Sequence, residues 1–94
     1  AMQQIACQVV VRGMVTGVGF RYAALREVTD HGDIRGYVRN VDERTVECLL
    51  QGPRTDVEAI IAWLRHGPPS ARVTDCRVDS LPVDPKRPFF HVTY

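Results

Sequence analysis

Three glycines and an arginine within a stretch of nine residues form the part of the sequence best suited to chemistry. Gly13, Gly17 and Gly19 follow an apolar run, and Arg21 stands where a helical pattern begins. Glycine reaches positive φ angles at little cost and has no side chain to block a close ligand. Successive backbone N–H groups can then turn toward one anion, helped by the N-terminus of the next helix. Because a guanidinium there adds paired donors, the segment predicts a phosphate-binding loop.

A glycine-rich turn without a ligand is the plain alternative for residues 13–20. Their spacing matches neither the dinucleotide fingerprint nor a Walker loop, which requires Lys followed by Ser or Thr. A cation at a helix N-terminus, however, opposes the helix macrodipole. Such local conflicts are expected at functional sites, so the position of Arg21 favours an anion between it and the glycines.

Asparagine, histidine and cysteine give weaker signals. Asn40 taken alone indicates a turn. The histidines and cysteines do not have the spacing of metal ligands, so no metal site is predicted; they are His31, His66, His91, Cys7, Cys48 and Cys76. An odd number of cysteines without a CxxC pair indicates a reducing compartment. A Cys7–Cys48 disulfide stays open if their strands are neighbours.

Length and composition predict one domain over residues 1–94. The net charge is +1, from 12 basic and 11 acidic residues, which favours neither nucleic acid nor a membrane surface as a partner. No apolar run approaches the roughly 18 residues that span a bilayer, and no secretory signal is recognisable. We therefore expect a cytoplasmic protein. Ala1 precedes Met2 and is expected to be a cloning remnant.

Hydrophobic periodicity predicts seven elements. In order they are strand 5–12, helix 21–31, strand 34–41, strand 45–51, helix 55–66, strand 71–81 and strand 89–94. Gly52 and Pro53 are expected to end the strand before them, and Thr55 with Glu58 has the spacing of a capping box. The order indicates an α+β, ferredoxin-like split βαβ sandwich (βαββαβ). Both helices would cover one face of an antiparallel sheet, with the first and third strands central.

Two motifs in this arrangement resemble those of the acylphosphatase family. Residues 13–21, GMVTGVGFR, are similar to the family signature G-x-V-Q-G-V-x-F-R. Residues 36–40, GYVRN, are similar to a second motif, G-[WY]-V-x-N. The segment 67–73 and Tyr94 also resemble the family, so the likeness extends over nearly the whole chain.

The resemblance implies hydrolysis of an acyl phosphate to a carboxylate and inorganic phosphate, without a metal or cofactor. Arg21 would bind the phosphate, and Asn40 would hold the attacking water. The backbone of the loop would complete the phosphate site, with Val15, Thr16, Gly17, Val18, Gly19 and Phe20. The expected binding partner is the small-molecule acyl phosphate, and the protein is expected to be a monomer. In some family members the C-terminal carboxylate orients the arginine, which makes the carboxylate of Tyr94 a hypothetical neighbour of Arg21.

Three positions depart from the family pattern. Thr16 replaces the usual Gln, Val41 stands where some members carry a hydroxyl, and Arg44 occupies a turn position that is often Gly. If Arg44 needed a positive φ, the strain would cost roughly 1–2 kcal/mol. None of these changes removes Arg21 or Asn40, so we expect activity.

Two other functions are compatible with the same fold. One is a non-catalytic module that binds an anion or another ligand. The other is a single-stranded RNA binder, which the near-zero net charge and the missing K/R-G-F motif disfavour.

Overall fold

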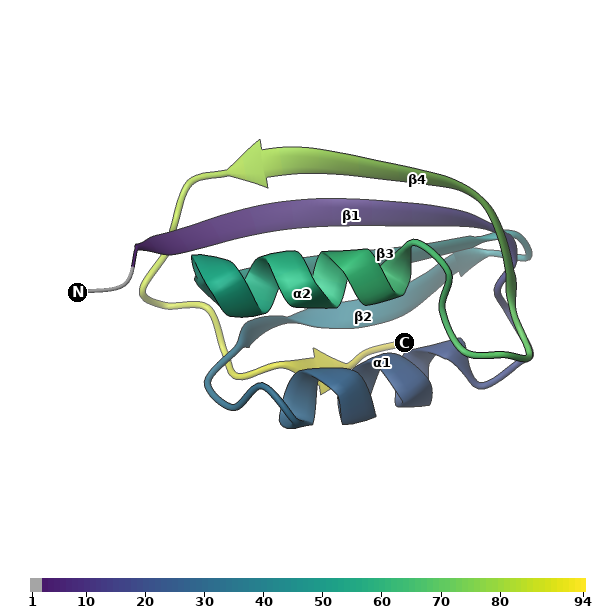
Figure 1. The fold of residues 1–94 in the computed structure, drawn as a ribbon, viewed down its shortest axis with the longest axis horizontal. Coiled ribbons are helices and arrows are strands. Elements are labelled where there is room, and N and C mark those ends of the chain that lie inside the picture. The colour runs from purple at the N-terminus through teal and green to yellow at the C-terminus, as the bar shows by residue number, and fades with distance from the viewer. Residues whose placement is uncertain (1–2) are drawn as a thin grey trace.

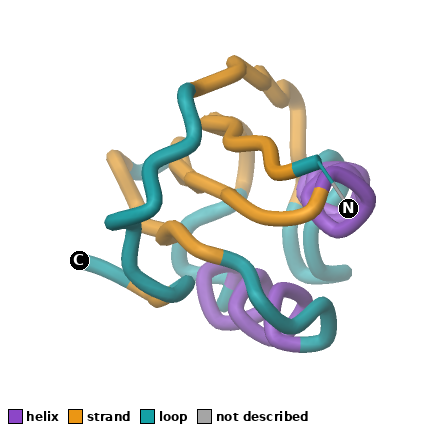
Figure 2. Tube along the Cα trace, turned by 90° about the vertical axis from the view of Figure 1, so that its left-hand side faces the viewer, coloured by secondary structure: helices purple, strands orange, loops and turns teal. Residues whose placement is uncertain are grey.

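The fold is a five-stranded sheet covered on one side by two helices (Figures 1 and 2). The computed structural model describes residues 3–94. Its elements are β1 (Gln4–Met14), α1 (Phe20–Thr29), β2 (Arg35–Asp42), β3 (Thr45–Pro53), α2 (Arg54–Leu64), β4 (Arg72–Leu81) and β5 (His91–Val92). The strand order β4-β1-β3-β2-β5 confirms the ferredoxin-like βαββαβ plan, with β1 and β3 inside. The expectation about Ala1 lies outside the described residues.

The last strand corrects the prediction of a wholly antiparallel sheet. A six-residue strand over 89–94 was expected, but β5 has two residues and pairs with β2 in parallel. The direction follows from the connection. β4 ends at the end of the sheet where β2 begins, and the proline-rich segment crosses there to the opposite edge (Figure 1). β5 therefore starts beside the start of β2 and runs the same way.

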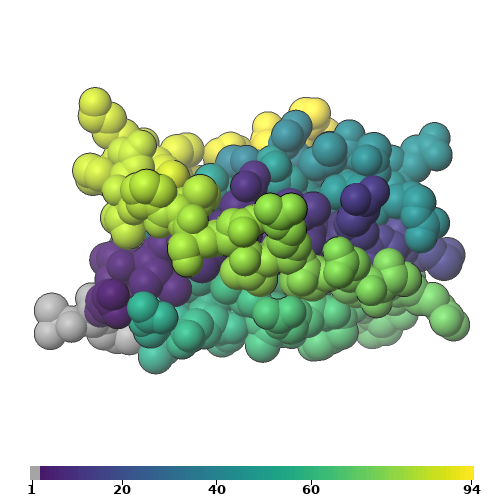
Figure 3. Space-filling model, turned by 90° about the horizontal axis from the view of Figure 1, so that it is seen from above, coloured from purple at the N-terminus to yellow at the C-terminus, as the bar shows by residue number. Residues whose placement is uncertain are grey.

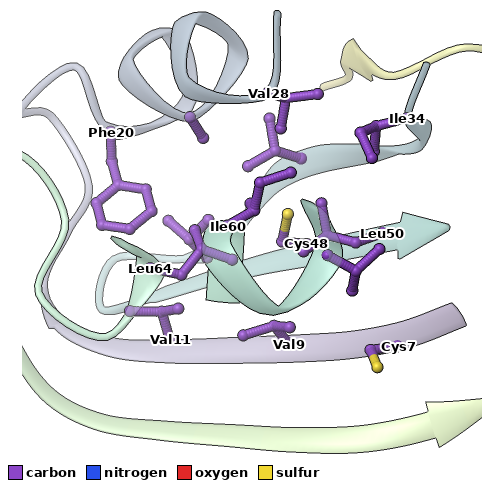
Figure 4. Close-up of a cluster of buried hydrophobic side chains, with 14 of the residues drawn as sticks. Cys7, Val9, Val11, Phe20, Val28, Ile34, Cys48, Leu50, Ile60 and Leu64 are labelled. Atoms are coloured by element: carbon purple, nitrogen blue, oxygen red, sulfur yellow. The ribbon is translucent and has the colours of Figure 1, made fainter. Parts of the chain in front are cut away.

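The core lies between the sheet and the two helices, as Figure 4 shows. Alternate residues of β1 and β3 face the helices, as their apolar–polar alternation predicts. Fully buried members of this cluster include Val9, Val11, Val46, Cys48 and Leu50 from the strands and Ala24, Val57, Ile60 and Leu64 from the helices. All three cysteines are free. Cys7 lies opposite Leu50 and Cys48 opposite Val9, so the two are not a cross-strand pair.

The start of α2 differs from the predicted capping box. β3 continues through Gly52 to Pro53, and Pro53 itself is the N-cap, without a side-chain capping bond. The helix begins at Arg54, so Thr55 lies inside the first turn. The first helical N–H is satisfied from another direction, because Arg54 N donates to Gln3 O at 3.0 Å. Tertiary pairing with the chain before β1 thus replaces the local cap.

The open face of the sheet carries a polar cluster centred on Glu47. Its carboxylate accepts hydrogen bonds from Gln8 Nε2 (2.7 Å), Tyr37 OH (2.9 Å) and Arg39 Nε (2.8 Å). Burial raises the pKa of Glu47, but the bonds from Arg39, Tyr37 and Gln8 outweigh it and hold the pKa below its ordinary value of 4.5. The cluster ties β1, β2 and β3 together on the side away from the helices.

Replacing Glu47 with glutamine is expected to lower the free energy of unfolding by roughly 1–2 kcal/mol at pH 7, because the amide loses charge-assisted bonds. A carboxyl with a depressed folded pKa stabilises the fold above its unfolded pKa and loses that effect as pH falls through the folded pKa. The difference from the parent protein should therefore shrink below about pH 4.5. Urea unfolding at several pH values measures it. Glu43→Gln, in the β2–β3 turn, is the control, and an equal loss there would contradict the role of Glu47.

Gly13 allows β1 to bend shortly before the loop that leads to α1. The β1–β4 register shifts between Arg12 and Gly13, and Gly13 has φ 138°. A Cβ built at Gly13 would lie 2.1 Å from the carbonyl oxygen of Arg72. Such a contact requires the two strands to separate, so a side chain is incompatible with this bulge.

Gly13→Ala should lower the free energy of unfolding by about 3 kcal/mol or more. Gly17→Ala is the matched comparison, since Gly17 also has positive φ but open space where its Cβ would lie. Its cost should be limited to roughly 1–2 kcal/mol of backbone strain. Urea unfolding of both variants measures the difference, and equal costs would contradict the close approach at Gly13.

Candidate functional site

The segment between β1 and α1 forms an open loop of unpaired backbone donors. Gly17 and Gly19 have φ angles of 71° and 76°, and Gly19 is the N-cap of α1. A Cβ at either glycine would meet nothing within 4 Å, so the loop surface there is open. No N–H group of residues 15–20 donates a hydrogen bond to any other of residues 3–94. The donors of Thr16, Gly17, Val18 and Gly19, which are exposed or half-buried, are therefore available to an anion beside the positive end of the helix, whereas Val15 and Phe20 are buried.

The loop is held by its neighbours rather than by bonds of its own. Three connections meet at its end of the molecule: the loop, the β2–β3 turn and the α2–β4 connection (right side of Figure 1). Gly13 N donates to Arg44 O at 3.0 Å, and the Thr16 hydroxyl donates to Glu43 O, so the turn supports the loop from one side. The Ser70 hydroxyl donates to Val18 O at 2.9 Å from the other. Thr16, a departure from the family pattern, thus has a definite structural contact.

Phe20 fixes the point where α1 starts. Its side chain is 2% exposed, and its ring centroid lies 5.7 Å from that of Trp63 on α2. Gly67 passes so close that a Cβ there would lie 2.4 Å from the Phe20 ring. The buried ring fixes the first turn of α1, and with it the backbone position of the next residue, Arg21.

Arg21 is half-buried and has no acidic partner among residues 3–94. Its guanidinium carbon lies 4.7 Å from the centroid of the Tyr94 ring. The hydroxyl groups of Tyr94 and Tyr22 are hydrogen-bonded, and this bond raises the pKa of Tyr94. The hypothesis that the Tyr94 carboxylate orients Arg21 needs correction, because the ring makes the contact and no ion pair joins the two residues. A ring holds a guanidinium without neutralising its charge.

Asn40 lies near the end of β2, on the face that the helices cover. Side chains alternate along a strand, and Asn40 shares its face with the fully buried Val38, whereas Arg39 turns to Glu47 on the open face. The side chain of Asn40 makes no hydrogen bond within residues 3–94. β5 runs alongside β2, and Thr93 N donates to Val38 O at 2.9 Å. The next residue, Tyr94, reaches Arg21, so Asn40 and Arg21 lie at the same end and on the same side of the sheet.

The β2–β3 turn accommodates Arg44 without strain. No residue other than glycine has a positive φ in the described part of the chain, so the expected cost at Arg44 does not arise. Arg44 N donates to Asp42 Oδ1 at 2.8 Å, which closes the turn and lowers the pKa of Asp42. Val41 is the extra residue at the register shift between Asn40 and Asp42, and its side chain is exposed.

One groove of the described protein lies away from this loop. It has a volume of about 330 Å³ and is bordered by the first residues of β1, by α2 and by the end of β4. Figure 3 shows the start of β1 between these two segments. None of the residues that line this groove belongs to the loop of residues 15–20. Within residues 3–94 no three His, Cys, Asp or Glu side chains gather in a metal-binding group. None of the described helices is long and apolar enough to span a bilayer.

The contacts that the sequence did not reveal are those between distant segments. The Ser70–Val18 bond and the Tyr22–Tyr94 bond join residues 52 and 72 positions apart. A serine after two prolines and a tyrosine near the end of the chain carry no local signal for such roles. Only the similarity of segment 67–73 and Tyr94 to a known family indicated that they matter.

The chain is similar in sequence and in fold to known proteins. The family model for acylphosphatases matches residues 7–92. An acylphosphatase of Burkholderia cenocepacia is 53% identical over 66 residues, which are 69% of this chain and 65% of that protein. The chain thus spans slightly less than two thirds of that relative. Among solved structures, acylphosphatases from Coxiella burnetii (TM-score 0.87, 28% identity, 96% and 93% of the two chains) and Bacillus subtilis (0.86, 31%, 96% and 99%) superimpose closely.

Proposed function

The chain belongs to the acylphosphatase family, and on that basis we propose that it hydrolyses the carboxyl–phosphate bond of an acyl phosphate. Water attacks phosphorus, the bond between phosphorus and the carboxyl oxygen breaks, and the carboxylate leaves with the electron pair. The attacking water loses its proton to the products or to solvent. The products are a carboxylate and inorganic phosphate.

One observation carries this proposal. The N–H groups of residues 15–20 have no hydrogen-bond partner in the described protein, and Arg21, the next residue of the chain, has no acidic partner there. Val15, Thr16, Gly17, Val18, Gly19 and Phe20 would supply main-chain donors, and Arg21 would supply the charge. This combination suits a phosphoryl group better than a single-charge ligand, because several donors surround one compact anion.

The proposed roles need little covalent chemistry. A carboxylate is a good leaving group, so catalysis of this reaction amounts to positioning and to stabilising charge on the phosphoryl oxygens. Asn40 cannot act as a strong base, but its amide can orient a water through its oxygen and its NH2 group. No step in this scheme requires a metal or a cofactor.

Hydrolysis of benzoyl phosphate tests the proposed function. We expect steady-state turnover with inorganic phosphate as a competitive inhibitor, and the same rate with and without a chelator. Phosphate binding without turnover would instead support a non-catalytic anion-binding module on the same fold. A protein that shows no turnover and also binds no phosphate would contradict the assignment of the loop.

The predictions about localisation, oligomeric state and partners are those made from the sequence. We expect a cytoplasmic monomer that acts on a small molecule and does not bind nucleic acid. Sedimentation of the purified protein would test the monomeric state.

A further inference from the structure

We infer that Ser70 is a positioning residue of the phosphate loop, because its hydroxyl holds the peptide between Val18 and Gly19 with the N–H group turned into the anion site. This inference rests on the proposed function and names a residue to which the family motifs quoted above give no role. Its basis is one hydrogen bond, from Ser70 Oγ to Val18 O at 2.9 Å, between segments 52 residues apart.

The geometry of a trans peptide links this bond to the site. In a planar trans peptide the carbonyl oxygen and the N–H of the next residue point in opposite directions, and the described chain contains no cis peptide. A hydroxyl that holds the Val18 carbonyl toward the α2–β4 connection therefore directs the Gly19 N–H away from that connection. Gly19 is the N-cap of α1, so its N–H belongs to the free donors of the loop.

This peptide needs an external restraint more than its neighbours do. Turning it over would change ψ of Val18 and φ of Gly19 by roughly half a turn. Glycine accepts φ angles of either sign at similar cost, so Gly19 offers little resistance. The reversed peptide would present the Val18 carbonyl to the anion, which replaces an attractive dipole by a repulsive one. The Ser70 bond favours the orientation that binds.

Ser70 itself stands on a stiff support. It follows Pro68 and Pro69, whose rings fix their φ angles, and Ala71 N donates to Pro68 O at 2.9 Å across the turn. Just before them, Gly67 packs against the buried Phe20 ring without room for a Cβ. Phe20 belongs to the same loop-to-helix junction, so the support and the loop are held in one frame.

Three variants test the inference. Ser70→Ala removes the hydroxyl, Ser70→Thr keeps it, and Ser80→Ala removes an exposed serine of β4 at the far groove. For each, we would measure KM and kcat with benzoyl phosphate, the Ki of inorganic phosphate, the urea midpoint, and the phosphate-induced shift of the Gly19 amide resonance.

Ser70→Ala should raise KM and Ki together by about three- to tenfold, the factor that one ordinary hydrogen bond represents. Its kcat should change less, its urea midpoint should match that of Ser80→Ala, and the Gly19 shift should diminish. Ser70→Thr should restore KM, Ki and the shift.

Any of four results would overturn the inference. If the parent protein is active and Ser70→Ala keeps the parent Ki and Gly19 shift, Ser70 does not position the loop, and the proposed function stands. If the Ki of Ser70→Ala rises only together with a fall in its urea midpoint, the role of Ser70 is merely structural. The same holds if Ser70→Thr behaves as Ser70→Ala. A parent protein that neither turns over benzoyl phosphate nor binds phosphate would remove the proposed function and the inference together.

Discussion

Arg21→Ala should nearly abolish hydrolysis of benzoyl phosphate, with kcat/KM reduced by roughly 10²- to 10⁴-fold. The guanidinium can make two parallel bonds to a phosphoryl group, and each charge-assisted bond contributes roughly 1.5–3 kcal/mol. KM should rise because the phosphate loses an anchor, and kcat should fall because charge on the phosphoryl oxygens is no longer stabilised in the transition state. Steady-state kinetics with benzoyl phosphate measures both.

The fold should survive this change. Arg21 is half-buried, its guanidinium packs on the Tyr94 ring, and a cation so near a helix N-terminus opposes the macrodipole. Arg26→Ala, near the other end of α1, is the matched control and should keep the parent kinetics. Circular dichroism and the urea midpoint verify that Arg21→Ala is folded. A folded Arg21→Ala protein with parent kinetics would exclude a phosphate-binding role for Arg21.

Asn40→Ala should lower kcat by roughly 10²-fold or more, the effect expected when a key positioned donor is lost. KM should change little, because the amide is assigned to the attacking water and not to the phosphate. This split between kcat and KM distinguishes Asn40 from Arg21, for which both constants should change. Steady-state kinetics and the Ki of inorganic phosphate give the comparison.

The fold is expected to tolerate Asn40→Ala as well, since the Asn40 side chain makes no hydrogen bond within residues 3–94. Gln8→Ala removes an amide from the open face, where Gln8 bonds to Glu47 at 2.7 Å, and serves as the control. It should reduce stability slightly and leave kcat unchanged. Equal kcat for the Asn40→Ala and parent proteins would remove the water-positioning role.

The element order followed from local patterns because those patterns reflect burial directly. The alternation of Cys7, Val9 and Val11 against Gln8 and Val10 appears in the structure as a helix-covered face and a more open face. What the patterns did not predict depends on distant partners. The parallel direction of β5 follows from where β4 ends, and the start of α2 depends on a bond from Arg54 to Gln3.

The residues of the candidate site likewise fall into those that local sequence features reveal and those that depend on distant segments. The glycines and Arg21 were found from the sequence, because positive φ and a cation at a helix start are local features. Asn40 depended on the resemblance to a family, since an asparagine near a turn is otherwise unremarkable. The ring of Tyr94 over Arg21 and the hydroxyls of Thr16 and Ser70 on loop and turn carbonyls come from segments that only the fold brings together.

Titration of ¹⁵N-labelled protein with inorganic phosphate tests whether the main-chain N–H groups of residues 15–20 and Arg21 together bind a phosphoryl group. We expect the amide resonances of residues 15–20 and the side-chain Nε–H of Arg21 to shift along one saturable curve. The midpoint of that curve should match the Ki of phosphate in the benzoyl phosphate assay. In Arg21→Ala the midpoint should move to a higher phosphate concentration, because binding is weaker. Saturation without shifts in residues 15–20, or shifts centred on other arginines such as Arg12 and Arg44, would contradict such binding.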